Sequence, residues 1–217
     1  MSAVPAAVIF DCDGVLVASE RLVNAIESRE LARIGVYLSP DELYLRFKGK
    51  TLDQDVAEIE RERGAPLPAS WVYDYAMATA LGFVRELQPV AGVEQVVRRV
   101  IAAGLPCGVA SQSPPARVAL SLAVTNLAHY FGPRVYTASL VERPKPAPDL
   151  FLHAAAALGV APRACVVIED SPSGVRGALA AGMTVYGYAA DEDANALAAA
   201  GARVFTAMDE LPALLGV

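Results

Sequence analysis

Six short apolar segments alternate with segments of helical periodicity, and this alternation constrains the fold more than any other feature of the chain. Several of the apolar segments are rich in β-branched residues, as buried parallel strands are. They cover residues 8–10, 105–110, 135–136, 166–168, 185–188 and 203–205. Because strands joined through helices form a parallel sheet with helices on both faces, we predict an α/β fold with a doubly wound parallel sheet.

The predicted helices between these strands end where helix termination is expected. They cover residues 93–103, 115–127, 150–158, 174–181 and 194–200. Gly104, Gly159, Gly182 and Gly201 follow four of them, at the position where a helix commonly ends in a left-handed residue. Four of the predicted helices are therefore followed by a residue that commonly ends a helix, which supports the strand–helix alternation.

One part of the chain breaks the alternation, because helices without any strand are predicted from about residue 19 to residue 87. Residues 39–42 form a capping box, and residues 51–54 open a further helix. A connection of about 70 residues is far longer than a βαβ crossover needs. We therefore predict a Rossmann-like core of residues 1–17 and 88–217, and a helical cap of residues 18–87 inserted after the first strand.

Composition and charge exclude several classes of partner. The chain is 54% hydrophobic, with a formal net charge of −6 and a pI of about 5.0. It has no basic tract for nucleic acid, no apolar segment long enough for a bilayer, and no basic n-region of a signal peptide. Its three cysteines lie singly in apolar segments, as reduced core cysteines do. We expect a cytoplasmic protein without nucleic-acid or membrane partners; its oligomeric state stays open, and a monomer is compatible with the sequence.

Polar side chains gather where predicted strands end, which is where doubly wound sheets bind ligands. Asp11 and Asp13 leave the first strand on the same side, because side chains alternate along a strand. Two neighbouring carboxylates repel each other unless a proton or a cation intervenes. Mg²⁺ is the expected cation, because it takes oxygen ligands and is commonly shared with a substrate phosphate. Asp170, after the fourth strand, would add a further carboxylate, and Glu169 would help to orient this metal site.

Two further residues suit a phosphoryl group. Lys145 would supply a compact positive charge to phosphoryl oxygens and to Asp11, and the Ser111 hydroxyl would donate to the same group. Taken singly, each has an ordinary explanation, since Ser111 also fits a helix cap and Lys145 a solvated charge. Taken together with the carboxylates, they indicate a site for a metal ion and a phosphate. The chain has three lysines and fifteen arginines, so a lysine at position 145 suggests a need for an ammonium group.

The order of these motifs resembles the haloacid dehalogenase (HAD) superfamily over essentially the whole chain. Residues 10–16, Phe-Asp-Cys-Asp-Gly-Val-Leu, resemble its first motif, and Ser111, Lys145 and residues 169–171 its second, third and fourth. The chain is similar to the phosphoglycolate phosphatase and β-phosphoglucomutase branch, especially its small sugar-phosphate phosphatases. The resemblance implies that Asp11 is a nucleophile forming an aspartyl-phosphate and that Asp13 is the general acid and base. It also implies Mg²⁺ held by Asp11, the Asp13 main-chain carbonyl and Asp170.

Two positions depart from the family pattern. Ala18 stands where an aspartate usually supports the hinge to the cap, so cap closure is expected to be looser. Val23 stands where the mutases carry a cap histidine, which favours hydrolysis over the return of a phosphoryl group.

Substrate contacts are expected from the cap and from the second motif. Arg46, Lys48, Gly49 and Lys50 lie between two predicted cap helices, and in this family such a loop contacts the leaving group. Their positive charges suit an anionic substrate tail, although a solvated turn is the alternative explanation. Gln112, next to Ser111, is also expected to bind substrate.

We therefore expect a Mg²⁺-dependent phosphatase for a small phosphorylated metabolite: a sugar phosphate, a phosphosugar acid or a phosphoglycolate-like compound. A β-phosphoglucomutase-type isomerase is one alternative. A non-catalytic phospho-receiver domain is a remoter one, because receivers are shorter, lack a cap and carry the phosphorylated Asp on a later strand.

Overall fold

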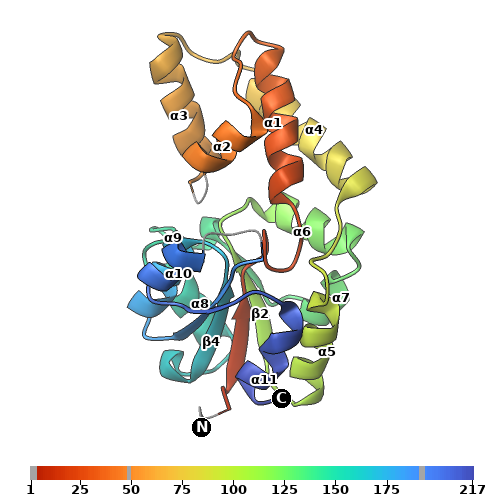
Figure 1. The fold of residues 1–217 in the computed structure, drawn as a ribbon, viewed down its shortest axis with the longest axis vertical. Coiled ribbons are helices and arrows are strands. Elements are labelled where there is room, and N and C mark those ends of the chain that lie inside the picture. The colour runs from red at the N-terminus through yellow and green to blue at the C-terminus, as the bar shows by residue number, and fades with distance from the viewer. Residues whose placement is uncertain (1–3, 48–49, 191–193) are drawn as a thin grey trace. The chain divides into compact units, whose positions relative to one another are not determined.

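The computed structural model describes residues 4–47, 50–190 and 194–217 (Figure 1). The chain forms two compact units. One comprises Met1–Val17 and Pro89–Val217, and the other is Ala18–Gln88. We call them the α/β unit and the helical unit and describe each by itself. Within the described ranges, no helix has the length and apolar character needed to cross a membrane.

The α/β unit is built on a six-stranded sheet in which every pairing is parallel, in the order β3-β2-β1-β4-β5-β6. The strands are β1 (Ala7–Phe10), β2 (Cys107–Ser111), β3 (Val135–Thr137), β4 (Cys165–Glu169), β5 (Thr184–Tyr188) and β6 (Arg203–Phe205). All six strands were expected from the apolar segments, and the predicted fold class is confirmed. Because β1 lies between β2 and β4, the chain reverses its direction of winding beside β1, where doubly wound sheets bind ligands.

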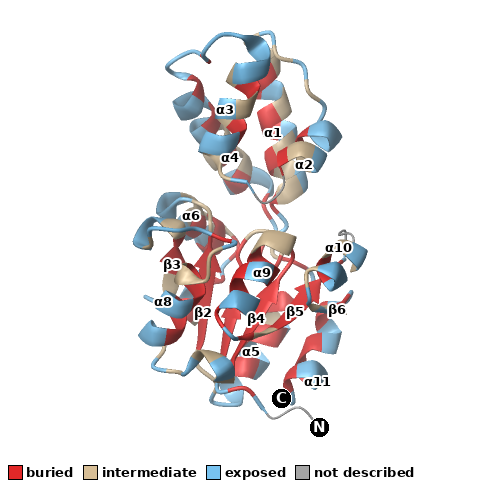
Figure 2. Cartoon of the chain, turned by 90° about the vertical axis from the view of Figure 1, so that its left-hand side faces the viewer, coloured by how far each residue is buried: buried red, intermediate tan, exposed pale blue. Residues whose placement is uncertain are grey.

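Helices cover both faces of this sheet (Figures 1 and 2). They are α5 (Val93–Ala102), α6 (Pro115–Val124), α7 (Ala128–Phe131), α8 (Asp149–Ala157), α9 (Pro172–Ala180), α10 (Ala194–Ala199) and α11 (Leu211–Leu215), with 3₁₀ turns at Ala138–Leu140, Pro162–Ala164 and Met208–Glu210. The helix expected over residues 115–127 ends at Val124. Asn126 has a φ of 57°, which interrupts the helix before α7 begins. Sequence reasoning missed α7 and α11, which are four and five residues long.

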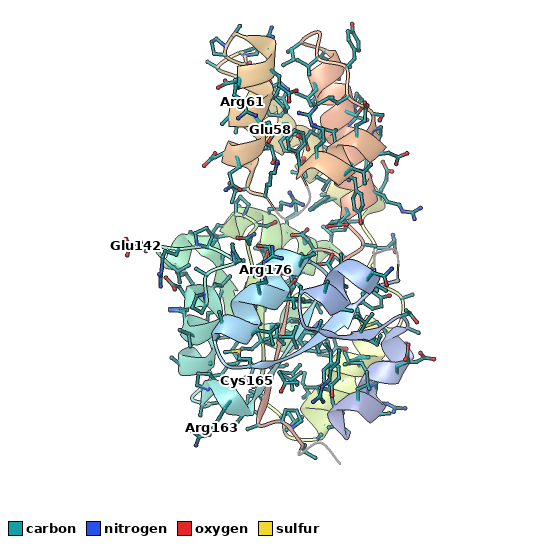
Figure 3. The ribbon with its side chains drawn as sticks, turned by 60° about the vertical axis from the view of Figure 1, so that its left-hand side comes forward. Glu58, Arg61, Glu142, Arg163, Cys165 and Arg176 are labelled. Carbon is teal, nitrogen blue, oxygen red and sulfur yellow. The ribbon has the colours of Figure 1, made fainter. Side chains whose placement is uncertain are left out.

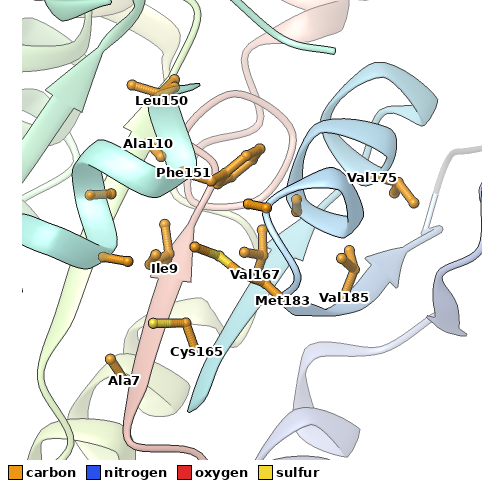
Figure 4. Packing of buried hydrophobic residues seen from close by; sticks show 14 of the residues in the cluster. Ala7, Ile9, Ala110, Leu150, Phe151, Cys165, Val167, Val175, Met183 and Val185 are labelled. Carbon is orange, nitrogen blue, oxygen red and sulfur yellow. The ribbon is translucent and has the colours of Figure 1, made fainter. Parts of the chain in front are cut away.

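The alternation of side chains along β1 divides the core between the two faces. Ile9 lies in the cluster shown in Figure 4, against residues of α8, α9, β4 and β5 such as Phe151 and Val167. Phe10 points to the opposite face, where its ring meets the edge of the Phe131 ring with the centroids 6.2 Å apart. Burial on both faces explains why the strands are continuously apolar. It also fixes the direction in which the chain leaves β1 at Asp11.

The helical unit contains α1 (Glu20–Ala32), α2 (Pro40–Phe47), α3 (Leu52–Arg63) and α4 (Trp71–Glu86), and its described residues contain no strand. The predicted capping box at residues 39–42 is confirmed, and the helix start predicted at residues 51–54 is a second capping box. The Ser39 N–H donates to Glu42 and the Glu42 N–H donates to the Ser39 hydroxyl, and Thr51 pairs with Gln54 in the same way. These caps fix the starts of α2 and α3.

Candidate active site

The candidate active site lies at the carboxyl ends of β1, β2 and β4. The Asp11 N–H donates to the Ile168 carbonyl at 2.9 Å, so the pairing of β1 with β4 continues one residue beyond β1. Asp11 is therefore held beside the end of β4, where Glu169 and Asp170 follow. All three carboxylates are buried, with exposed fractions of 7% or less.

Lys145 contacts the carboxyl ends of all three strands. Its Nζ donates to Asp11 Oδ1 at 2.5 Å, to Glu169 Oε1 at 2.6 Å and to the Ala110 carbonyl at 2.9 Å. Burial by itself lowers the pKa of a lysine, but the carboxylates of Asp11 and Glu169 outweigh it and raise the pKa of Lys145 above its usual range. The ammonium is therefore charged, and it is fixed next to the Asp11 carboxylate.

Glu169 is occupied by hydrogen-bond donors at both oxygens. Oε1 accepts from Lys145, and Oε2 accepts from the backbone N–H groups of Asp170 and Ser171 and from the Ser171 hydroxyl. Gly174 makes this position possible, because a Cβ there would collide with the Glu169 carboxylate. Glu169 therefore connects Lys145 to Asp170 and to Ser171, the N-cap of α9.

Asp11 is buried beside both a cation and further carboxylates. Burial raises the pKa of Asp11, the Lys145 ammonium opposes that shift, and the carboxylates of Glu169 and Asp13 add to it. The carboxylates of Asp11, Asp13, Glu169 and Asp170 are accompanied by the cations Lys145 and Arg117. Carboxylates crowded in this way repel each other, and a bound cation would relieve that repulsion.

Asp13 is held by two residues of the segment after β2. The Ser113 hydroxyl donates to Asp13 Oδ2 at 2.7 Å, and Arg117 Nη2 donates to Asp13 Oδ1 at 3.2 Å. Sequence reasoning assigned no role to the Arg117 side chain and placed Ser113 only at a helix start. No local signal indicates these contacts, because Asp13 lies 100 residues before Ser113 and 104 before Arg117.

Ser111 and Gln112 lie at the end of β2. Ser111 is 1% exposed, and its Oγ accepts from the Ser113 N–H at 3.1 Å, so its own hydroxyl proton can be donated elsewhere. Gln112 is partly buried in the following loop. The structure thus brings Ser111 to the same edge of the sheet as Asp11, through the pairing of β2 with β1.

The donor set fits a hard divalent cation. Gly14, with a φ of 78°, has no Cβ, and a Cβ there would collide with the Asp170 carboxylate. The Asp170 carboxylate therefore lies directly against the loop that follows Asp13, among oxygen donors of the kind Mg²⁺ prefers. In the described part of the chain, no three His, Cys, Asp or Glu side chains are grouped so as to hold a metal ion by themselves. Two carboxylates and one main-chain carbonyl would coordinate the ion only in part, so substrate or water would have to complete its coordination.

Residues 5–182 match the family model described as a haloacid dehalogenase-like hydrolase. The chain belongs to this family. The expected family and the expected hydrolase class are therefore confirmed. Membership of a hydrolase family argues against the phospho-receiver alternative.

Relatives of this HAD-like hydrolase match it over most of its length. The chain is 31% identical to the 6-phosphogluconate phosphatase of Escherichia coli over 96% of this chain and 93% of the relative. It is 33% identical to hexitol phosphatase B of the same organism, over 82% and 80% of the two chains. A solved HAD family hydrolase from Deinococcus radiodurans R1, with bound phosphate and sodium, is 34% identical with a TM-score of 0.82, over 99% and 96% of the two chains.

The cap residues predicted for this HAD-like hydrolase have partners inside the helical unit. Arg46 Nη2 pairs with Glu62 at 2.7 Å and with Glu58 at 3.3 Å, and Lys50 Nζ pairs with Glu58 at 2.8 Å. Figure 3 shows Glu58 on α3. Lys48 and Gly49 lie outside the described residues. The cations of this loop are thus partly compensated by acidic neighbours, a feature that the local sequence did not reveal.

Proposed function

We propose that the chain is a Mg²⁺-dependent phosphatase that hydrolyses a small phosphorylated sugar or sugar acid through an aspartyl-phosphate on Asp11. The contact between the Lys145 ammonium and the Asp11 carboxylate, at 2.5 Å in a buried site, carries this proposal. It supports a nucleophile whose charge is compensated and whose position is fixed. The named phosphatases among the relatives support the reaction class.

Asp11 would attack phosphorus through Oδ2, because Oδ1 is occupied by Lys145. The Oδ2–P bond forms while the bond from phosphorus to the leaving oxygen breaks. Lys145 and the Ser111 hydroxyl would neutralise charge on the phosphoryl oxygens during the transfer. Both are buried, so their interactions with the charge are weakly screened by water.

Asp13 would handle the proton. It would protonate the leaving oxygen in the first half-reaction and then accept a proton from the water that attacks the aspartyl-phosphate. Ser113 and Arg117 each hold one of its oxygens, which supports a carboxyl kept in a defined orientation. We propose that both act as positioning residues for Asp13.

A Mg²⁺ ion would be held by Asp11, Asp170 and the Asp13 main-chain carbonyl, and it would neutralise charge on the phosphoryl group. Glu169 has one oxygen engaged with Lys145 and the other with the N–H groups of Asp170 and Ser171. We therefore propose that Glu169 positions Lys145 and does not itself bind the ion.

The helical unit would act as the cap, and its loop of Arg46, Lys48, Gly49 and Lys50 would contact the substrate, together with Gln112 of the α/β unit. An anionic tail on the substrate would compete with Glu58 for Lys50, which is 35% exposed and therefore accessible. The relative named 6-phosphogluconate phosphatase supports a carboxylate tail.

The mutase alternative is disfavoured by Val23, which is a buried residue of α1 and carries no group that could move a proton. A screen of phosphate release from sugar phosphates, phosphosugar acids and phosphoglycolate tests the proposal. We expect free phosphate and a requirement for Mg²⁺ that EDTA reveals. Isomerised sugar phosphate without phosphate release would instead support the mutase.

A further inference from the structure

Helix α4 of the helical unit is apolar on two opposite faces. Its buried face consists of Trp71, Tyr75, Thr79 and Phe83, which are each 5% exposed or less. A second row of apolar side chains, here called the outer ridge, is exposed: Tyr73 at 67%, Met77 at 46%, Leu81 at 53% and Val84 at 64%. At 3.6 residues per turn, the outer ridge covers an arc of about 80°, on the opposite side of the helix from the buried face.

Such a double-sided helix is unusual on a monomer. A surface helix normally buries one apolar stripe and presents polar residues to water. The outer ridge extends along most of the four turns of α4, and contiguous exposed apolar residues of this kind mark interaction sites. The small side chains of Ala76 and Ala80 lie beside it, so another helix could approach closely.

The charges beside the outer ridge favour a second copy of the same helix. Asp74 and Arg85 lie on the same flank of the ridge, about 20° apart around the helix axis. In an antiparallel pair related by a two-fold axis near residue 79, Met77 faces Leu81 of the other copy and Tyr73 faces Val84. The same axis brings Asp74 of each copy to Arg85 of the other. Both the apolar pairs and the opposite charges are thus self-complementary, as an isologous interface requires.

We propose that the outer ridge of α4 is a dimer interface in which two chains pack antiparallel through this helix. The interface consists of one pair of four-turn helices, which is smaller than the interfaces of about 1,200 Å² or more that hold stable complexes. The dimer is therefore a weak, concentration-dependent one. The proposal is independent of the catalytic proposal, because it uses no residue of the candidate active site.

Sedimentation velocity of the full chain from about 1 µM to about 1 mM tests the interface. We expect a monomer–dimer equilibrium in the wild-type protein and a monomer at all concentrations in Met77→Glu and Leu81→Glu. Leu45→Glu is the matched control, because Leu45 is an 81% exposed residue of α2 outside the ridge, and it should leave the dimer intact. Circular dichroism and phosphatase activity should be unchanged in all three variants.

Charge reversal tests the antiparallel arrangement. Asp74→Arg and Arg85→Asp should each weaken the dimer by about tenfold, because each places like charges together at two symmetric positions. The double variant should restore the wild-type affinity. A wild-type protein that stays monomeric up to about 1 mM, or a dimer that survives Met77→Glu, overturns the proposed interface. Failure of the double variant to recover overturns the antiparallel register.

Discussion

Replacing Glu169 by glutamine should destabilise the protein even when no metal is present. Four donors converge on the Glu169 carboxylate: the Lys145 ammonium, two backbone N–H groups and the Ser171 hydroxyl. A glutamine amide has one acceptor and one donor group, so in either orientation its NH₂ faces a donor. Glu169 is fully buried, with its carboxylate packed against Gly174, so a glutamine at this position cannot turn its NH₂ to solvent.

The magnitude follows from the loss of a buried ionic partner. Removing one member of a buried charged pair costs about 3–5 kcal/mol. In a chain of this size each kcal/mol lowers the melting temperature by about 2–4 °C, so Glu169→Gln should melt about 6–20 °C below the wild type. Asp11→Asn is the matched comparison. It also removes a partner of Lys145, but it relieves repulsion among the carboxylates, so its melting temperature should stay near that of the wild type.

Thermal melting in EDTA separates positioning of Lys145 from direct metal binding. If Glu169 were a metal ligand, its neutralisation would relieve repulsion in the metal-free protein, and the melting temperature would rise or stay constant. We expect a fall. A Glu169→Gln protein as stable as the wild type in EDTA would refute the role of Glu169 in positioning Lys145. Glu142→Gln, at an exposed position, is the control and should melt like the wild type.

Three further outcomes are expected. Arg117→Met should lower kcat/KM for an alkyl phosphate by about tenfold or more while sparing p-nitrophenyl phosphate, because the nitrophenolate leaving group needs no proton. Arg117→Lys should recover part of the loss, and equal losses on both substrates would refute the role of Arg117 in positioning Asp13. Burial and the Glu27 carboxylate raise the pKa of Asp55 to about 7, so the protonated form is stabilised and stability should fall as pH rises from about 4 to about 7. Between those pH values the melting temperature of Asp55→Asn should fall less than that of the wild type. Parallel plots of melting temperature against pH for the two proteins would contradict this reasoning. Lys50→Ala should reduce kcat/KM for 6-phosphogluconate more than for glucitol 6-phosphate. Glucitol 6-phosphate has a hydroxymethyl group where 6-phosphogluconate has its carboxylate, so equal effects on the two substrates would refute the anionic-tail hypothesis.

The elements of the fold were predictable because their signals are local. Each strand is a short apolar segment, and the starts of α2 and α3 are marked by the capping boxes at Ser39 and Thr51. The break between α6 and α7 was not predictable, because it depends on the left-handed backbone of Asn126, a conformation that the surrounding helical pattern does not signal.

The site was predictable in its members but not in all of its contacts. The family motifs indicate Asp11, Lys145 and Glu169, yet they do not indicate that both oxygens of Glu169 are occupied by donors. The contact of Arg117 with Asp13 joins residues 104 positions apart, so no local pattern could specify it. In the helical unit, Lys50 precedes α3 and pairs with Glu58 of that helix, eight residues later. Charge patterning alone left open whether this loop binds substrate.

A phosphoryl group on Asp11 is the central claim, and the Asp13→Asn variant tests it most directly. This variant should still form the aspartyl-phosphate from p-nitrophenyl phosphate but should hydrolyse it slowly, because no general base activates water. We predict a burst of one nitrophenolate per active site, followed by slow turnover. Borohydride reduction should then convert residue 11 into homoserine, which peptide mass spectrometry detects. A variant that shows neither a burst nor modification of Asp11, although the wild type releases phosphate from the same substrate, would contradict the account.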